Sequence, residues 1–291
     1  MSEQIQVLSA SAPDYELLDS GDRLKLERFG DVVLVRGEPK AWWKPADPAL
    51  WQKAACRYED GGARKGWSFS GRVSPPVLDF DGVKFAVKFM DGTKHLGVFP
   101  EQLPHWRFIA SSLKGRDFKT PPKLLNLFGY TGAASLFAAK AGFETTHVDA
   151  SKPSVDWARK NQELSGLSGA KIRSIVDDAL KFVRREQRRG AKYDAIVLDP
   201  PAFGRGPKGE LWKLEKMLPQ LLEECRKILS ARPLFAIITL YSIDASAIMA
   251  GNVMRQYFGA LGGAEISQGE LLLKPAKGCA LPLSIWAKAV F

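Results

Sequence analysis

The residues best placed for chemistry surround a glycine turn in the middle of the chain. A short apolar run, Leu124–Leu127, leads into this turn, and small residues then open a helical pattern from Ala133. Glycine permits a tight turn against which a ligand can lie, and the start of a helix directs unpaired N–H groups at the same space. The pattern therefore predicts a strand, a ligand-binding turn and a helix. The expected binding residues of the turn are Phe128, Gly129, Tyr130, Thr131 and Gly132.

An acidic residue follows the next predicted strand. Asp149 stands twenty residues after Gly129, at the end of the run 145–148, where a carboxylate can accept hydrogen bonds from two ribose hydroxyls. A dinucleotide would require the spacing G-x-G-x-x-G for its pyrophosphate, but this turn offers only G-x-x-G, with Tyr130 in the middle. We interpret the turn as the site of a nucleoside cofactor without phosphate, and S-adenosylmethionine (SAM) fits. The alternative is an ordinary strand-to-helix turn.

Aspartates also follow the third and the fourth predicted strands. Ligands of a parallel sheet bind beyond the carboxyl ends of its strands, and the third strand, 171–176, ends at Asp177 and Asp178. A carboxylate there can accept a hydrogen bond from an adenine amino group, for which we prefer Asp178. The same side chain is equally suited to cap the helix that follows. The expected cofactor contacts beyond the turn are Asp149, Ala150, Ser151, Asp178 and Ala179.

The fourth strand, 193–198, ends in the most specific local signal of the chain. Two consecutive prolines fix φ and remove two N–H donors, so the neighbouring carbonyls are held stiffly. Asp199 before them is placed to orient a methyl acceptor and to take its proton. Phe203 either stacks on a base or packs under its loop. The expected catalytic residues are Asp199, Pro200, Pro201 and Phe203.

The segments around these residues alternate between strand and helix from residue 120 onward. Nearly all-apolar strands that alternate with helices predict a parallel sheet covered on both faces. Two last strands, 266–273 and 283–290, are too close in sequence for a helical crossover and must be antiparallel. We expect an α/β fold with a doubly wound, mostly parallel seven-stranded sheet ending in an antiparallel hairpin. This layout resembles the class I SAM-dependent methyltransferases, which are Rossmann-like.

The first hundred residues read as mostly β. Residues 23–29 and 31–36 look like a hairpin, and residues 83–89 alternate cleanly between two Asp-Gly turns, with 95–99 as their expected partner strand. We therefore predict a β-rich domain at 1–104, with substrate binding as its possible role, and a catalytic domain at 105–291. Trp42 is expected in packing, or alternatively in stacking on a base.

Composition sets limits on the function class. With 45% hydrophobic and 25% charged residues the chain is globular, and no apolar run approaches the ~20 residues of a membrane span. Its start lacks a secretory signal. Three widely spaced cysteines suggest neither disulfides nor a zinc site. We expect a cytoplasmic protein with no membrane or metal partner.

Positive charge is concentrated in the half with the cofactor turn. Residues 1–119 hold 18 Lys and Arg against 16 Asp and Glu (+2), whereas residues 120–291 hold 24 against 16 (+8). This excess favours a polyanionic partner, although solubility alone would also explain it. Four arginines, at 184, 185, 188 and 189, share a helix face, and the basic loop 204–209 directly follows the Asp-Pro-Pro segment. For RNA contact we favour the loop, since a solvated outer face is the alternative interpretation of the helix.

Four motifs together resemble the bacterial large-subunit ribosomal-RNA methyltransferase I/K family. They are Leu96–Gln102, Asn126–Gly132, His147–Ser151 and Asp199–Gly204, and the resemblance runs from about residue 15 to the end. It implies SAM as cofactor, RNA as partner and RNA methylation, in the course of rRNA processing, as activity. The N-terminal segment does not look like the PUA module that some members carry.

The resemblance also restricts the acceptor atom. The fifth strand ends in Thr239-Leu240-Tyr241-Ser242, where 5-methylcytosine members place the cysteine that must attack the ring first. A nitrogen or an oxygen is therefore the better acceptor, unless Cys279 reaches the site. In amino-methyltransferases an aromatic residue directly follows Asp/Asn-Pro-Pro, and here Ala202 intervenes. Two other readings remain open: a methyltransferase for a small molecule or protein, and an RNA-binding protein that no longer transfers methyl groups.

Overall fold

The computed structural model describes residues 4–61 and 64–291. Contacts within the chain separate two compact units. Unit 1 consists of residues 4–8, Pro104–Leu271 and Ser284–Phe291, and unit 2 of Ser9–Leu103 and Leu272–Leu283. The main division thus lies beside the expected boundary at 104, while both ends of the chain belong to unit 1. The assignment of two functional domains stays a prediction.

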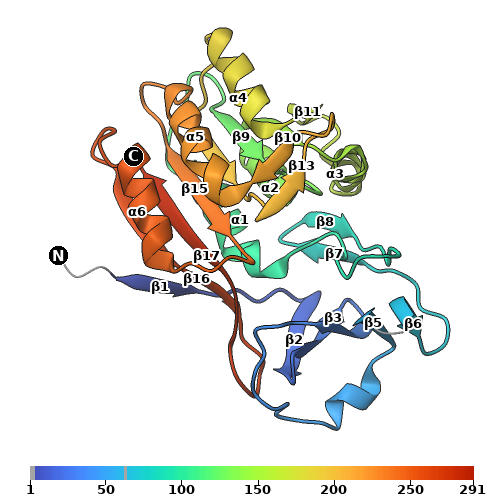
Figure 1. Cartoon of the computed structure of the whole chain (residues 1–291). Coiled ribbons are helices and arrows are strands. Elements are labelled where there is room, and N and C mark those ends of the chain that lie inside the picture. Colours follow the sequence, from blue (N-terminus) through green and yellow to red (C-terminus); the bar gives the residue numbers. More distant parts are fainter. Residues whose placement is uncertain (1–3, 62–63) are drawn as a thin grey trace. The chain divides into compact units, whose positions relative to one another are not determined.

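Unit 1 is built on one eight-stranded sheet, which confirms the expected fold class (Figure 1). Its central strands are parallel, and the last strand runs antiparallel to its neighbour β15. The order is β1 (Ile5–Leu8), β16 (Glu265–Leu273), β17 (Leu281–Val290), β15 (Phe235–Leu240), β12 (Ala195–Leu198), β9 (Lys123–Leu127), β10 (Glu144–Asp149) and β11 (Ile172–Val176).

The sheet has one strand more than the seven expected. Residues Ile5–Leu8 form β1, which pairs in parallel with β16 at the edge of the sheet. Four residues, of which Ile5 and Val7 are exposed, give no alternation that distinguishes a strand from a loop. Only the free edge of β16 makes this segment a strand, because it supplies the hydrogen-bonding partners.

Helices cover both faces of this sheet. One apolar core lies between the strands and α4 (Ala179–Arg188), α5 (Leu214–Lys227) and α6 (Ala247–Phe258). The other lies against α1 (Leu103–Ser111) and α2 (Ala133–Ala141), and α3 (Lys152–Leu164) packs on β10 and β11. Burial on both faces explains why β12 is continuously apolar and why every residue of β15 is buried.

Helix α5 begins at Leu214. The preceding residues form a small hairpin of β13 (Phe203–Arg205) and β14 (Leu211–Lys213), joined by a turn with Gly209 at φ 86°. Trp212 is buried between two exposed neighbours, which is the period of a strand. The basic segment 204–209 therefore comprises the end of β13 and the turn of the hairpin, and is not an irregular loop.

Unit 2 contains a five-stranded and a two-stranded sheet. The first consists of β2 (Tyr15–Gly21), β3 (Leu24–Phe29), β4 (Val32–Gly37), β5 (Cys56–Gly61) and β6 (Arg64–Phe69), and the second of β7 (Val77–Phe80) and β8 (Val83–Ala86). Short 3-10 helices lie at Leu50–Lys53 and Pro100–Gln102. The β3–β4 hairpin confirms the prediction for residues 23–36.

The expected partner of residues 83–89 was wrong. β8 pairs with the preceding strand β7, whereas residues 95–99 form no strand and are joined to the expected segment by a hydrogen bond from Lys88 N to Leu96 O (3.3 Å). Asp81 and Gly82 have φ of 54° and 79°, the conformation of the two-residue hairpin turn that matches the twist of antiparallel strands. Of the two Asp-Gly dipeptides that bracket the segment, the first makes the hairpin.

Trp42 does not pack in a core. Its side chain is 78% exposed, with the Arg23 guanidinium 5.9 Å from its ring centre, and both residues belong to unit 2. Within the described residues, every helix is too short or too polar to cross a lipid bilayer.

Candidate functional site at the carboxyl ends of the strands

The turn after β9 has an unusual backbone conformation. Phe128 and Tyr130 lie at φ 58° and 48°, a region that costs a non-glycine residue about 1–3 kcal/mol. Backbone hydrogen bonds hold the turn in place, from Gly129 N to Val148 O (3.0 Å) and from Gly132 N to Gly129 O (2.9 Å). Strain of this kind persists where the surrounding structure fixes it, and it is concentrated at ligand sites.

Both glycines of the turn are required by their own protein neighbours. A Cβ atom at position 129 would lie 2.4 Å from the ring of His147, and one at position 132 would lie 2.9 Å from Cβ of Ala158 on α3. The sequence suggested that the missing Cβ atoms make room for a ligand. The structure shows that they make room for a side chain of β10 and for a helix.

Buried polar side chains of β9, α2 and β10 pack next to the turn and support it. Asn126 Nδ2 donates to Ser135 Oγ (2.9 Å), and Ser135 Oγ lies 3.1 Å from His147 Nδ1. Burial, together with the positive charge of Arg159, lowers the pKa of His147 to about 4, so the imidazole is neutral at pH 7. Sequence analysis assigned no role to these residues, although an asparagine within an otherwise apolar strand was a visible signal.

Asp149 connects the turn to the end of β10. Its Oδ2 accepts from Tyr130 N and its Oδ1 accepts from Ser151 N, both at 2.8 Å. The carboxylate is half-buried, and burial raises its pKa although the two N–H groups oppose that rise. Because each carboxylate oxygen has two acceptor positions, the side chain retains capacity for two hydroxyl donors, as a ribose requires.

The other expected cofactor residues have structural roles as well. Ser151 caps α3, and Asp178 caps α4 by accepting from Lys181 N with Oδ1 (2.9 Å). Ala179 is the buried first residue of α4, and Thr131 is buried with its carbonyl accepting from Asn161 Nδ2. The helix-cap alternative for Asp178 is thus present, and contact with adenine stays a prediction.

Asp199 lies next to the turn because β12 is paired with β9. The pairing ends at Leu198 and Leu127, and the residues that follow on the two strands are Asp199 and Phe128. Parallel neighbours end at the same edge of a sheet, so the expected catalytic and cofactor residues come together there.

The hairpin holds the Asp-Pro-Pro segment. Trp212 Nε1 donates to Pro201 O (2.7 Å), and the Trp212 ring lies 4.9 Å from the ring of Phe128. Pro200 is buried, while Phe203 is 58% exposed at the start of β13. An exposed ring beside this segment is free to stack on a planar group.

Three residues around the end of β15, the strand next to that of Asp199, were not identified from the sequence. Thr239 is paired with Trp286 across β15 and β17, and His105 of α1 contacts both. Its Nδ1 lies 3.4 Å from Thr239 Oγ1, and its ring meets that of Trp286 edge to face at 5.4 Å. Burial, together with Lys288, lowers the pKa of His105 to about 3. His105, Thr239 and Trp286 thus form an uncharged cluster beside the strand ends. It joins residues more than 130 positions apart, which no local pattern reveals.

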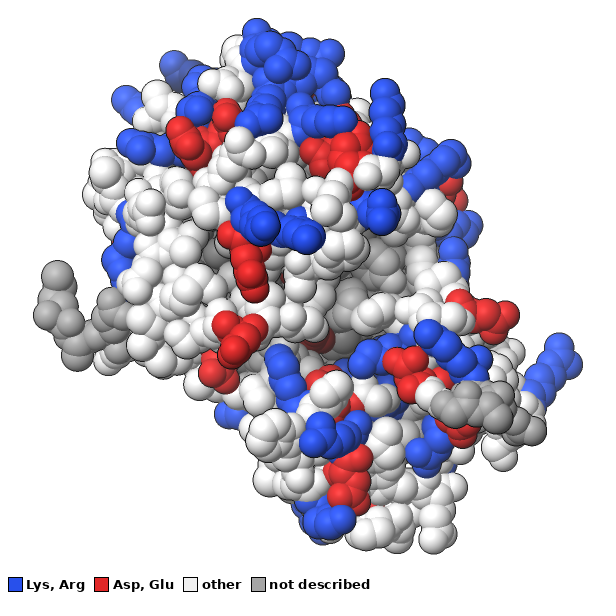
Figure 2. Space-filling view, viewed as in Figure 1, with Lys and Arg blue, Asp and Glu red and all other residues white. Residues whose placement is uncertain are grey.

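The basic residues of α4 are largely engaged within the chain. Arg185 pairs with Asp177 (2.6 Å), Arg189 with Glu186 (3.0 Å) and Arg184 with Glu224 (3.7 Å). Lys181 pairs with Glu210 of the hairpin turn. Figure 2 shows Lys and Arg side chains gathered at the top of the view, where Figure 1 places α4. Because so many are paired, this helix offers less free charge than its sequence suggests.

Within the part of the chain that the structure describes, no group of three or more His, Cys, Asp or Glu side chains is arranged to hold a metal ion. The groups that do lie at this edge of the sheet are the carboxylates Asp149 and Asp199, the strained turn and the exposed ring of Phe203.

Comparison with known proteins gives three informative matches. A solved structure, the SAM-dependent methyltransferase from Agrobacterium tumefaciens, has 42% sequence identity and a TM-score of 0.93, covering 99% of this chain and 95% of that one. The ribosomal RNA large subunit methyltransferase I of Aeromonas salmonicida is 35% identical over 132 residues, which are 45% of this chain and 32% of that protein. Methyltransferase K of Neisseria meningitidis is 28% identical over 223 residues, 72% of this chain and 61% of that protein.

The chain spans about a fifth to a third of the length of the first curated relatives it matches. No protein-family model matches it.

Proposed function

Because this chain belongs to the SAM-dependent methyltransferases, we propose that it transfers a methyl group from SAM to a base of RNA, with ribosomal RNA as the substrate. One observation carries the proposal. Asp199 and the cofactor turn lie on adjacent strand ends in a chain whose curated relatives are ribosomal RNA methyltransferases. The place of action is the cytoplasm.

The proposed cofactor contacts are those of the strand ends. Asp149 accepts hydrogen bonds from the ribose, residues 128–132 line the methionine side, and Ala150 and Ser151 lie beside Asp149. Asp178 and Ala179 face the adenine. The fit rests on the acceptor capacity that Asp149 retains and on the fixed, strained turn. SAM supplies a methyl group on a positively charged sulfur, so displacement needs alignment more than acid or base strength.

Asp199 is proposed to orient the acceptor and to take its proton. The prolines after it restrict the backbone, and Trp212 fixes the carbonyl of Pro201. Phe203 stacks on the base. A base within a duplex has to be flipped out or already unpaired to reach this edge.

A nitrogen or an oxygen is the proposed acceptor. Within unit 1, Cys225 is buried in α5, and burial raises the pKa of its thiol, whereas attack on cytosine C5 needs a thiolate. In unit 2, the exposed Trp42 and the neighbouring Arg23 support a substrate-binding role for residues 1–104, since bases stack on such side chains.

The test is transfer of labelled methyl from SAM to ribosomal RNA, intact ribosomal subunits, total protein and a metabolite fraction, each offered separately. Asp199→Ala removes the group proposed to orient the acceptor and to take its proton, so labelling of RNA should fall by about 10²–10⁴-fold. Asp156→Ala removes an exposed carboxylate on α3; it is the matched control and should retain wild-type labelling.

Label only in protein or metabolites would exclude RNA as the substrate and leave the cofactor site standing. Absence of label in every fraction, together with a normal SAM titration, would indicate a binding protein in place of an enzyme.

A further inference from the structure

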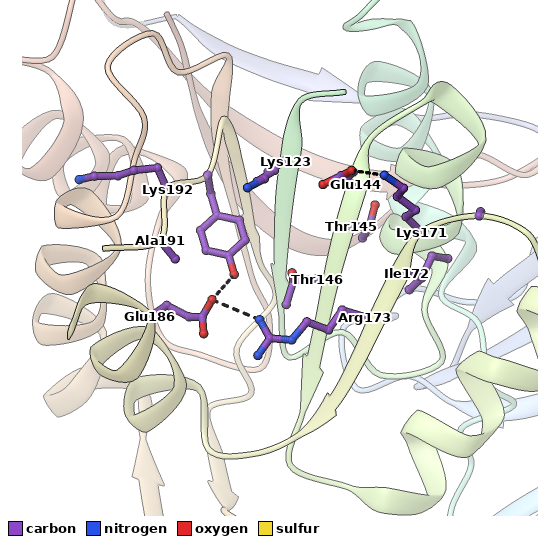
Figure 3. A pocket seen from close by; sticks show the side chains of 12 residues that line it. Lys123, Glu144, Thr145, Thr146, Lys171, Ile172, Arg173, Glu186, Ala191 and Lys192 are labelled. Carbon is purple, nitrogen blue, oxygen red and sulfur yellow. Dashed lines mark hydrogen bonds and ion pairs between the residues drawn. The ribbon is translucent and has the colours of Figure 1, made fainter. Parts of the chain in front are cut away.

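A cavity of about 540 Å³ lies at the opposite end of the strands from the proposed methyl-transfer site. It forms where β9, β10 and β11 begin, and where the chain returns from α4 (Figure 3). We name it the edge pocket and define it by Lys123, Thr146, Lys171, Arg173, Glu186 and Tyr193. None of these residues belongs to the cofactor or catalytic sets.

One wall of the edge pocket is a fixed network. Glu186 is 3% exposed and accepts from the Tyr193 hydroxyl (2.8 Å) and from Arg173 Nη1 (3.3 Å), as Figure 3 shows. Arg189 also pairs with it. Burial works against this carboxylate, but the hydrogen bond from Tyr193 and the charge of Arg173 outweigh it and lower the pKa of Glu186. Glu186 is therefore ionised and anchors Arg173.

Arg173 is held in one orientation, but its contacts do not use all of its N–H donors. Its guanidinium lies over the Phe182 ring at 5.7 Å and uses Nη1 for Glu186, while 46% of the side chain stays exposed. A guanidinium has five N–H donors, so donors remain for a ligand. A preorganised arginine loses little freedom when it binds an anion that presents a pair of oxygens to its N–H groups, as phosphate does.

The rim of the edge pocket is positively charged. Lys123 is exposed, and Lys171 is 75% exposed and pairs with Glu144 (2.6 Å). The lining holds four cations, Lys123, Lys171, Arg173 and Lys192, against Glu144 and Glu186, so its net charge is +2. Cations often stabilise the C-terminal end of a helix through its dipole. That role does not explain these cations, because three of the four lie at the starts of strands.

We propose that the edge pocket binds a phosphate of the RNA backbone, remote from the nucleotide that is methylated. This inference rests on the proposed function and extends it to the class of contact that holds the substrate. Strand β10 runs from Glu144 in the pocket to Asp149 at the cofactor end, a span of about 17 Å at ~3.3 Å per residue. An RNA therefore needs at least about five nucleotides, at ~3.4 Å each, to engage both ends.

The experiment is RNA binding by the full chain, measured by filter retention over a series of salt concentrations. The double variant Lys123→Gln, Lys171→Gln keeps the Arg173–Glu186 pair. Loss of one phosphate contact lowers the slope of log affinity against log salt by about 0.7–0.9. Affinity for a ribosomal RNA transcript should therefore fall about 5- to 8-fold near 0.1 M salt.

The matched control is Lys160→Gln, Lys277→Gln, which removes two exposed lysines outside the pocket and should bind as wild type. A trinucleotide should bind equally to all three proteins. Thermal unfolding of each variant verifies that it is folded.

Two results would overturn the proposal: equal loss of affinity in the pocket and control variants, or an unchanged salt slope in the pocket variant. In either case methyl transfer to RNA by the wild type would leave the proposed function intact. A wild type that neither binds nor methylates RNA would instead contradict the proposed function itself.

Discussion

At position 129, glycine is required by packing against another side chain of the protein and not by contact with a ligand. His147 occupies the space that a Cβ atom at position 129 would need, and its ring is in turn held by Ser135. The turn conformation at Phe128 and Tyr130 depends on this packing, because Gly129 donates to Val148 of the same strand. Single atoms thus set the geometry of the cofactor turn.

Replacing Gly129 with alanine should therefore lower the stability and weaken SAM binding. The new methyl group would stand 2.4 Å from the His147 ring, and overpacking of this kind typically costs about 1–3 kcal/mol. Urea unfolding and a SAM titration measure the two effects. Gly169→Ala is the matched control, since nothing lies within 4 Å of its Cβ position. A Gly129 variant as stable as the Gly169 variant would refute the packing argument.

At the scale of elements, the β13–β14 hairpin positions the Asp-Pro-Pro segment. Trp212 joins Pro201 by a hydrogen bond and Phe128 by ring contact, so it spans the expected catalytic and cofactor elements. The hairpin is joined to α4 through Glu210 and Lys181. That hydrogen bond from Lys181 lowers the pKa of Glu210 to about 2, which keeps the pair charged at neutral pH.

Trp212→Phe should reduce methyl transfer more than it reduces SAM affinity. The substitution keeps an aromatic ring but leaves Pro201 O without its N–H donor, which costs about 1–3 kcal/mol. Misalignment at the acceptor side should lower kcat by about 10- to 100-fold. Single-turnover kinetics and a SAM titration separate the two quantities. Phe258→Leu, a core change in α6, controls for lost stability and should keep its kcat.

Unit 2 contains a buried charged network that joins its strands. Arg36 donates two bonds of 2.7 Å to Glu27, and the Tyr15 hydroxyl donates a third of 2.8 Å. Lys25 lies 3.7 Å from the same carboxylate. Burial opposes ionisation of Glu27, but Arg36 and Lys25 outweigh it and lower its pKa to about 2. Its stabilising effect is thus present above pH 4.5 and is lost as pH falls towards 2.

Glu27→Gln should destabilise unit 2 by about 3–5 kcal/mol, because it leaves Arg36 buried without its counter-charge. Denaturant unfolding followed by tryptophan fluorescence reports this loss. Glu16→Gln removes a partly exposed carboxylate that pairs with Arg28, and should change stability by about 0–1 kcal/mol. If the two variants were equally stable, the network would be dispensable for unit 2.

At the scale of the whole molecule, two buried histidines make stability depend on pH. His105 and His147 have pKa values of about 3 and about 4, lowered first by burial, and both belong to unit 1. In the unfolded chain each titrates near 6.5. The unfolded state therefore binds more protons below pH 6.5, and stability falls as pH falls.

Thermal unfolding at pH 7.5, 6.5 and 5.0 should show a progressive loss of stability. Below the unfolded pKa each histidine contributes about 1.4 kcal/mol per pH unit. The variant His105→Gln should remove about half of the part of this dependence that His105 and His147 contribute. His95 of unit 2, whose pKa burial likewise lowers to about 4, contributes separately. A dependence unchanged by the substitution would mean that other groups, and not these histidines, bind the protons.

Much of the fold and of the proposed site could be predicted from the sequence. Apolar runs of strand length, separated by helical patterns, specify the order of elements, because a strand buried on both faces consists of consecutive apolar residues. Asp149 and Asp199 stood out because each is a polar residue at the end of such a run. The antiparallel end of the sheet followed from the short connection between its last two strands.

Only the tertiary structure decided which surfaces meet. The edge strand β1, the partner of β8 and the hairpin at 203–213 depend on neighbours that offer free hydrogen-bonding edges, and periodicity does not encode a partner. The same holds for Gly129 against His147 and for His105 beside Thr239. The periodicity of apolar residues in a sequence indicates which side chains are buried and in which kind of element. Contacts between residues distant in sequence form only when the strands pair and the helices pack on the sheet.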